Sequence, residues 1–579
     1  MESTTPRTAL FPWREVAIPV AVCCLGLVAT LYPMIFSGLR LTHGGLGDAR
    51  LVNYILEHGY RWVMQRPSHE SFWDVPVLYP YPHVSAFTEV MLGVGPYYWI
   101  WRWLGCAADT AFQLWILTVW SLNYAAAYFM LRSCVQAGAI SAAFGACLMS
   151  FGSVLQIQLG HPQMIPLFYV ALAIAALPRI LGAADAPRGA LRQRAWIAVF
   201  FTCAVLQAYA CFYLFFFFGL FCALALLWSL AFEDVRGQIL AAARKHWLTV
   251  SVCLLLASCA LGVLARHYLI TASEVGMRPY SVNLIPRWHS WLMMGPRNYL
   301  YGWVYALPFV PPPNPNHSTG VGLVTMVVCL TALLRRRHSP WIRVLLLAAG
   351  SLIVISTVVG DFSLWKVIHE CVPGGKAIRA VGRIGIVLLV PAAVGLTLYL
   401  ERLRSGRRMA LFAVVALICL AEQPHRHGWI DKQIVRDHVR AIAARVDRNS
   451  QAFFMVRTGP ADYRFVADDA NWVQLATDVP TINGRYGNFP PNWGLREAQD
   501  APVKSDADRA AVREALHAWV EGNDLDAQRV QIIEYEGLCV RRNQKATGTR
   551  ESGPSPLPPP GTPRTASRPS AHEHGAHGQ

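Results

Sequence analysis

Charged residues are scarce in this chain. Only 15% of its 579 residues are Asp, Glu, Lys or Arg, whereas 54% are hydrophobic. Soluble globular proteins carry about 25% charged residues, so the composition excludes a soluble enzyme of this length. A small-residue cleavage site is also missing after the first apolar run, which we therefore expect to be a retained helix. The sequence predicts a protein that crosses a membrane several times.

Apolar runs long enough to cross about 30 Å of hydrocarbon recur between Val16 and Leu420. We expect an all-α polytopic membrane bundle with about eleven transmembrane helices. They are placed at 16–38, 111–131, 139–156, 163–181, 195–212, 213–231, 247–270, 319–334, 342–359, 384–401 and 409–422. The stretch 84–104 is also apolar but contains Glu89, Pro96 and Arg102, and we interpret it as an interfacial or re-entrant helix.

Basic residues mark one side of the predicted bundle. They crowd every second short loop, as at 335–337 and 402–408, which is typical of cytoplasmic loops. We therefore expect residues 1–15 in the cytoplasm, the bundle in the membrane, and outer loops at 39–110, 271–318 and 360–383. The net charge of +16 arises mostly in the cytoplasmic loops, so it does not predict nucleic-acid binding.

The most informative acidic residue is Asp48, which follows the first apolar run in the glycine-rich segment 42–50. A carboxylate at the mouth of a membrane bundle can take a proton from a hydroxyl at the water–lipid boundary, so Asp48 is the candidate catalytic base. The pattern from Asp48 to Gln65 predicts an amphipathic helix along the membrane surface. Asp48 stands at its start, and a plain N-cap role is the alternative.

The outer loop 360–383 breaks the charge rule because it contains four basic residues. Arg379 and Arg383 are spaced i, i+4 at a helix entrance, where two guanidinium groups can clamp a phosphate at headgroup depth. Lys376 belongs to the same candidate anion site. Pairing of these residues with lipid headgroups or with outer-loop acids is the alternative.

Other polar residues on the expected outer side are candidate substrate contacts, namely His43, Asp74, Glu89, His161, Arg287 and His289. His161 stands between Gly160 and Pro162 at a span boundary, so capping of that helix is its alternative role. No group of residues has the close spacing of a zinc site, and we expect no metal. Most of the 14 cysteines lie in apolar runs; Cys371 and Cys539 are the thiols expected outside, where they could pair.

After the last apolar run the chain changes character. Charge density rises, and helix-like stretches at 434–448 and 506–521 flank strand-like ones at 452–457, 530–535 and 538–541. These features predict a small extracytoplasmic α/β domain over 424–545 and a disordered tail over 546–579. The domain has no nucleophile triad and no glycine-rich phosphate loop, so acceptor recognition or support is its expected role.

Five segments together resemble the GT-C superfamily of polytopic membrane glycosyltransferases, and in particular its large, poorly characterised bacterial branch. They are Gly47-Asp48, Gly160-His161-Pro162-Gln163, and residues 280–284, 373–383 and 480–487. The resemblance covers most of residues 15–540 and makes 16–423 the GT-C-like catalytic domain. Arg485 departs from the family pattern, which has an aromatic residue there, and Asn283 stands where an acid is common.

The resemblance implies a transferase in a bacterial inner (cytoplasmic) membrane that moves a sugar from a polyprenyl-phosphate donor to a hydroxyl of a glycan, lipid or protein acceptor on the outer face. Asp48 is then the base, and Lys376, Arg379 and Arg383 hold the donor phosphate. Some enzymes of this architecture use a divalent ion and others none; we expect no cofactor. A lipid-linked sugar flippase or other transporter, and a non-catalytic assembly protein, are the alternatives. Polar residues at one face of the bundle favour surface chemistry over transport.

Overall fold

The computed structural model describes residues 13–182, 187–277, 279–308, 310–404, 408–459 and 466–538. Each of the eleven apolar runs overlaps a long helix of its own, although several runs extend beyond the ends of that helix. These helices are α1 (Trp13–Phe36), α4 (Ala108–Cys134), α5 (Ala139–Phe151), α7 (Phe168–Leu181), α8 (Pro187–Ala210), α9 (Phe212–Leu230), α11 (Trp247–Val275), α12 (Leu323–Arg335), α13 (Pro340–Ile355), α15 (Leu389–Leu403) and α16 (Met409–Ala421). The predicted all-α polytopic membrane fold is confirmed.

The apolar helices differ in length. Within the described ranges, seven stretches are long and apolar enough to cross a membrane, and α12, α13 and α16 are apolar but shorter. The remaining helix, α8, carries Arg188, Arg192 and Arg194 in its first turns. The number of full spans therefore depends on how the shorter helices sit in the bilayer, whereas the multi-pass character does not.

Close packing in the bundle depends on small residues where two helices meet. A Cβ atom at Gly145 of α5 would lie 1.9 Å from Thr397 Oγ1 of α15, and one at Gly395 of α15 would lie 2.8 Å from the carbonyl oxygen of Cys329 in α12. Membrane helices associate through such contacts because lipid provides no hydrophobic driving force between them. These two glycines let α15 approach both of its neighbours.

The stretch 84–104 does not form a long helix. It contains the 3₁₀ turn η1 (Val84–Phe87) and the nine-residue helix α3 (Gly95–Trp103). Nine residues of α-helix extend about 14 Å, less than half of the hydrocarbon thickness. Helix α3 packs against α4 and α2 (Asp48–Val63), as expected for a segment that does not cross the bilayer.

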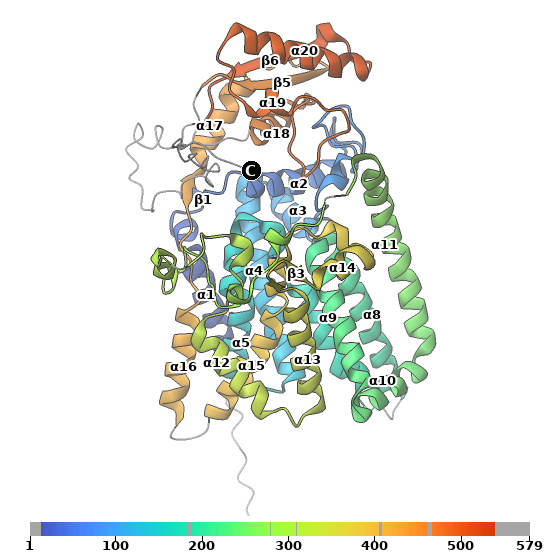
Figure 1. Cartoon of the computed structure of the whole chain (residues 1–579), viewed down its shortest axis with the longest axis vertical. Helices are drawn as coiled ribbons and strands as arrows, with labels where there is room; N and C mark the ends of the chain where they lie inside the picture. Colours follow the sequence, from blue (N-terminus) through green and yellow to red (C-terminus); the bar gives the residue numbers. More distant parts are fainter. Residues whose placement is uncertain are drawn as a thin grey trace, which may run out of the picture.

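Helix α2 lies across one end of the bundle, beneath the C-terminal part of the chain (Figure 1). The predicted amphipathic helix therefore forms, but its expected position on an open membrane surface is wrong. All eleven residues from 49 to 59 are buried, including the polar Arg50, Asn53, Glu57 and His58. The polar face of α2 packs against α18 (Val466–Thr477) instead of facing water.

The C-terminal part begins with β4 (Trp429–Asp431), which pairs antiparallel with β1 (Leu41–His43). Strand β5 (Ala452–Arg457) pairs in parallel with β6 (Val530–Tyr535), and both strands coincide with predicted ones. The helices around them are α17 (Lys432–Ala443), α18, α19 (Arg496–Asp500) and α20 (Asp506–Gly522). Residues 539–541 of the third predicted strand and the predicted disordered tail lie outside the described residues.

Short elements complete the fold. Helix α10 (Glu233–Lys245) and the ends of α12, α13 and α16 lie at the end of the bundle opposite the C-terminal part (Figure 1). The connections at the other end contain the short helices α6 (Ser153–Gln156) and α14 (Trp365–Cys371) and the strand pair β2 (Val358–Val359) and β3 (Phe362–Ser363). They also contain the 3₁₀ turns η2 (Ile157–Gly160), η3 (Pro162–Met164), η4 (Val282–Leu284), η5 (Trp288–Trp291), η6 (Gly302–Ala306), η7 (Pro315–His317), η8 (Gly375–Ala377) and η9 (Val381–Ile386). A further 3₁₀ turn, η11 (Ala527–Arg529), precedes β6 in the C-terminal part.

Candidate functional site

The side chain of Asp48 does not cap its helix. Gly47 is the N-cap of α2 and Asp48 is the first helical residue. The two carboxylate oxygens contact other parts of the chain: Oδ2 lies 3.2 Å from His161 Nε2, and Oδ1 lies 3.2 Å from Arg485 Nη2. The side chain is 29% exposed, so a small molecule can reach it. Asp48 is thus held between two donors at the end of the bundle that carries the C-terminal part.

His161 lies in the turn between η2 and η3, and its side chain makes no capping hydrogen bond to η3. Burial, followed by the charge of Arg383, lowers the pKa of His161 to about 4, although Asp48 acts in the opposite direction. The imidazole is therefore neutral at pH 7. In the tautomer that carries its proton on Nε2, it donates a hydrogen bond to Asp48.

Arg485 joins Asp48 to the C-terminal part of the chain. It lies in the segment between α18 and α19, and its Nη1 is 3.5 Å from Oδ2 of Asp468, a buried residue in the first turn of α18. From the sequence, Arg485 stood out only as a departure from a family pattern. Its place at the site depends on a contact between residues 437 positions apart, which nothing in the local sequence indicates.

Two of the three candidate phosphate-binding residues, Arg379 and Arg383, lie near Asp48 and His161. Arg383 lies in η9 with its guanidinium 5.0 Å from the ring centre of Tyr213, and the hydroxyl of Tyr213 accepts the backbone N–H of Arg379 at 3.0 Å. The positive charges of Arg383 and Arg379 both lower the pKa of His161. Asp48, His161, Arg379 and Arg383 therefore share one electrostatic environment.

Glu89 lies near Arg383 and accepts hydrogen bonds from the first backbone N–H groups of α9. Its carboxylate accepts the backbone N–H groups of Phe212 at 2.7 Å and of Tyr213 at 3.4 Å. Burial raises the pKa of Glu89 to about 7, although these hydrogen bonds and the charge of Arg383 lower it. Since Glu89 titrates near neutral pH, it can exchange a proton close to the candidate anion site.

His43 lies close to His161, but its side chain contacts neighbouring residues and not Asp48. Its Nδ1 accepts the N–H of Gly45 at 3.1 Å, and its ring packs edge-on against His427 and Trp429, with centroids 5.8 and 6.1 Å away. Burial lowers the pKa of His43 to about 3, so the ring is uncharged. This arrangement fixes the glycine-rich turn that leads into Asp48.

The structure does not bring the remaining candidates to Asp48. Lys376 Nζ pairs with Glu370 Oε2 at 2.9 Å. Asp74 accepts the N–H of His83 at 2.8 Å within its own loop. Arg287 and His289 lie at η5, where the backbone N–H of Arg287 donates to Ser290 Oγ at 2.9 Å.

In the described part of the chain, no group of three or more His, Cys, Asp or Glu side chains is placed to hold an ion, and the expected absence of a metal stays a prediction. The lack of a cofactor stays a prediction. Cys371 is exposed, and its expected partner, Cys539, lies outside the described residues.

No protein-family model and no curated protein matches this sequence. Among solved structures, the chain is similar to a cryo-EM structure of a mutant of the arabinofuranosyltransferase AftD from mycobacteria, with 15% identity and a TM-score of 0.47. The match covers 86% of this chain and 34% of that one, so this chain spans about a third of that protein's length. Similarity at this level does not assign an activity.

Proposed function

We propose that this chain is a multi-pass membrane glycosyltransferase of GT-C type that moves a sugar from a polyprenyl-phosphate donor to a hydroxyl of a glycan, lipid or protein acceptor. Asp48 is the base, His161 and Arg485 position its carboxylate, and Arg379 and Arg383 bind the donor phosphate. Lys376 contributes positive charge to the same loop. The active site and the C-terminal part face the extracytoplasmic side of a bacterial inner membrane.

One observation carries this proposal: the carboxylate of Asp48 is held by two donors, is still 29% exposed, and shares its environment with two arginines. A glycosyl transfer needs a base for the acceptor hydroxyl and cations for the departing phosphate, and this arrangement provides both. The basic connections at the opposite end of the bundle support the proposed orientation (Figure 1).

The proposed reaction conserves atoms and charge. Asp48 accepts the proton of the acceptor hydroxyl while the acceptor oxygen forms a bond to the anomeric carbon of the sugar. The bond from that carbon to the phosphate oxygen breaks, and its electron pair leaves with the lipid phosphate. Arg379 and Arg383 stabilise the negative charge that develops on the leaving group.

The direct test offers radiolabelled polyprenyl-phosphate sugars and membrane glycolipid acceptors to the full chain in nanodiscs. We expect a new glycosidic product, which Asp48→Asn reduces about 100-fold or more because a general base is lost. Asp506→Asn is the matched control, since that carboxylate is fully exposed on α20. Transfer by Asp48→Asn at the unchanged rate would reject the assigned base.

Two further measurements on the same nanodiscs test for a flippase and for a divalent ion. Movement of the donor between leaflets without a new glycosidic bond would support a flippase and contradict a transferase. Both oxygens of Asp48 already have partners, so we expect transfer to continue in EDTA; loss of transfer that added Mg²⁺ or Mn²⁺ restores would assign a divalent ion to the site.

A further inference from the structure

Helix α9 takes its N-terminal cap from a distant part of the chain. Its N-cap residue is Cys211, whose side chain makes no capping hydrogen bond. Glu89 provides the acceptor instead: its carboxylate takes the backbone N–H of Phe212 at 2.7 Å and that of Tyr213 at 3.4 Å. The first N–H groups of a helix have no partner within the helix, and a carboxylate there also meets the positive end of the helix dipole. Glu89 therefore fixes where α9 starts.

Tyr213, in this first turn, contacts both arginines of the candidate phosphate site. Its hydroxyl accepts the backbone N–H of Arg379 at 3.0 Å, and its ring centre lies 5.0 Å from the guanidinium of Arg383. The loop before Arg379 is packed closely on the same turn, because a Cβ atom at Gly374 would lie 2.8 Å from the ring of Phe212. The first turn of α9 is thus the surface on which the two arginines are held.

The two arginines are available to an anion. In the described part of the chain, neither Arg379 nor Arg383 has a carboxylate oxygen within 4.0 Å of its guanidinium nitrogens, whereas Lys376 is paired with Glu370 at 2.9 Å. Arg379 is exposed and Arg383 is partly exposed. A phosphate can therefore bind to both guanidinium groups without breaking an existing ion pair.

We propose that Glu89 is a positioning residue of the donor-phosphate site, which it holds in place through the first turn of α9 and Tyr213. This inference rests on the proposed function, because it takes Arg379 and Arg383 as the groups that bind the lipid phosphate. Glu89 acts on them through Tyr213, so its loss should change donor binding and not the chemical step at Asp48.

The charge of Glu89 makes the expected effect depend on pH. Burial raises the pKa of Glu89 to about 7, and the charge of Arg383 lowers it, so the two groups attract each other. The other groups that face the carboxylate are the thiol of Cys211, with Sγ at 3.8 Å, and Tyr268 of α11. A phosphate bound at Arg383 disfavours the ionised form of Glu89 by repulsion between like charges. By linkage, the phosphate should bind more tightly below pH 7, where Glu89 is protonated.

The test measures equilibrium binding of radiolabelled geranyl methyl phosphate to the full chain in nanodiscs, after subtraction of binding to empty nanodiscs. This probe is a phosphodiester and keeps one negative charge across the neutral range, so a pH dependence must come from the protein. Geraniol is the uncharged control. We expect saturable binding of the phosphodiester that weakens about threefold or more between pH 6 and pH 8.

Two substitutions separate the charge of Glu89 from its hydrogen bonds. Glu89→Gln keeps an oxygen for the N–H of Phe212, so its affinity should match that of the unchanged chain at pH 6 and should no longer vary with pH. Glu89→Ala also removes the acceptor and should weaken binding about tenfold at both pH values. Glu274→Gln is the matched control, because this exposed carboxylate accepts the hydroxyl of Tyr81 instead of a helix N–H. Thermal unfolding checks that each variant folds.

Two substitutions of Tyr213 separate its two contacts. Tyr213→Phe removes the hydroxyl that holds the backbone of Arg379 and should weaken binding about threefold. Tyr213→Leu also removes the ring beneath Arg383 and should weaken binding about tenfold or more. Tyr128→Phe is the control, since the hydroxyl of Tyr128 in α4 lies 3.5 Å from the carbonyl oxygen of Glu15 and should not affect the phosphate.

The outcomes distinguish this inference from the proposed function. Equal binding of geraniol, or no saturable binding of the phosphodiester, would overturn the donor site and the inference together. Binding that Arg383→Gln weakens but that Glu89→Ala and Tyr213→Leu leave unchanged would retain the donor site and overturn the positioning role. A pH dependence that survives in Glu89→Gln and disappears in His369→Gln would overturn the coupling to Glu89 and assign it to the histidine beside Glu370.

Discussion

Arg485 Nη2 lies 3.2 Å from the carboxylate of Asp48, and Arg485 Nη1 lies 3.5 Å from Asp468. One guanidinium therefore connects the helix that follows the first span to a helix of the C-terminal part. Because Asp48 has its second donor, His161, in the bundle, the carboxylate is fixed from both sides. The C-terminal part completes the candidate site rather than only covering it.

Arg485→Gln tests whether this contact positions the base. We expect kcat to fall about 10- to 100-fold with little change in the KM of the donor, because a misplaced base slows the chemical step. Initial rates at varied donor concentration provide both constants. Arg513→Gln on the exposed face of α20 is the matched control. A rise in donor KM at constant kcat would instead make Arg485 a donor contact.

Arg383→Gln tests the donor phosphate site. Arg383 packs on Tyr213 beside Glu89, within electrostatic range of His161, so we expect the donor KM to rise about tenfold or more when its charge is removed. Lys376→Gln should have a smaller effect, because Lys376 is already paired with Glu370. Equal effects of the two substitutions would contradict the distinction that the structure draws between them.

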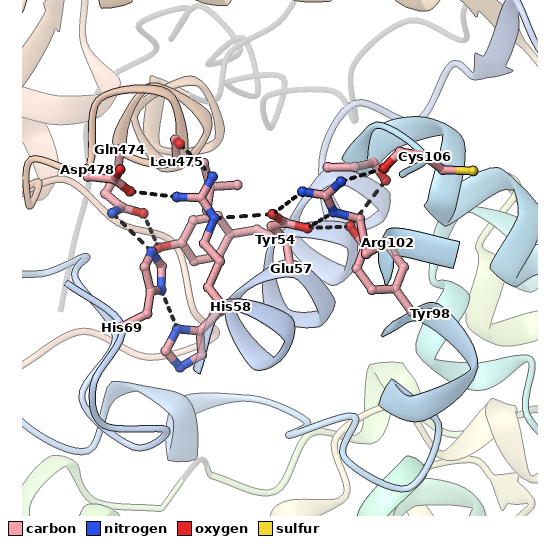
Figure 2. A network of polar contacts seen from close by, with 12 residues as sticks. Tyr54, Glu57, His58, His69, Tyr98, Arg102, Cys106, Gln474, Leu475 and Asp478 are labelled. Atoms are coloured by element: carbon pink, nitrogen blue, oxygen red, sulfur yellow. Dashed lines mark hydrogen bonds and ion pairs between the residues drawn. The ribbon is translucent and has the colours of Figure 1, made fainter. Parts of the chain in front are cut away.

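Glu57→Gln tests the junction between bundle and C-terminal part. Glu57 is 1% exposed and binds Arg61, Arg102 and the hydroxyl of Tyr98 (Figure 2). Loss of its charge leaves Arg102 without a carboxylate partner, whereas Arg61 keeps Asp478 at 2.7 Å. Because hydrogen bonds to charged groups contribute about 1.5–3 kcal/mol each, we expect a loss of about 1–3 kcal/mol of unfolding free energy. Thermal unfolding should show a lower midpoint than for Glu514→Gln on exposed α20. Equal midpoints would mean that water solvates these arginines.

The spans and the two parallel strands could be read from the sequence because their signals are local. A long apolar run must be helical in lipid, and the short stretches at 452–457 and 530–535, rich in β-branched and aromatic residues, indicate strands without knowledge of the partner. The amphipathic pattern of α2 also predicted the helix. What covers its polar face could not be read, since Arg50 pairs with Asp469, a residue 419 positions away.

The candidate site was partly readable for the same reason. Asp48 and His161 both stand next to spans on the expected outer side, so hydropathy alone placed them at one end of the bundle. Asp74 and Arg287 are also on the expected outer side, well inside the loops 39–110 and 271–318, yet they contact His83 and Ser290 of those loops. Hydropathy fixes the depth of a residue along the membrane normal, whereas its position around the bundle depends on helix packing.

A pair of buried histidines predicts that stability falls in acid. His58 Nδ1 lies 2.8 Å from His69 Nδ1, and His58 Nε2 lies 2.9 Å from the carbonyl oxygen of Phe72. His69 Nε2 is 3.4 Å from Gln474 Nε2, and Gln474 accepts the hydroxyl of Tyr54 (Figure 2). Neutral rings satisfy this chain, because His58 donates to Phe72 and accepts from His69, which accepts from Gln474. A second proton on either ring puts two donors face to face.

Burial lowers the pKa of His58 to about 4 and that of His69 to about 2. Below pH 6.5 the unfolded chain therefore binds more protons than the folded one, and stability falls as the pH falls. The loss should reach about 2 kcal/mol per histidine at pH 5. Thermal midpoints at pH 7.5 and pH 5 measure it. The double variant His58→Gln, His69→Gln should reduce this difference, whereas His517→Gln on exposed α20 should not; an unchanged difference in the double variant would assign the acid sensitivity elsewhere.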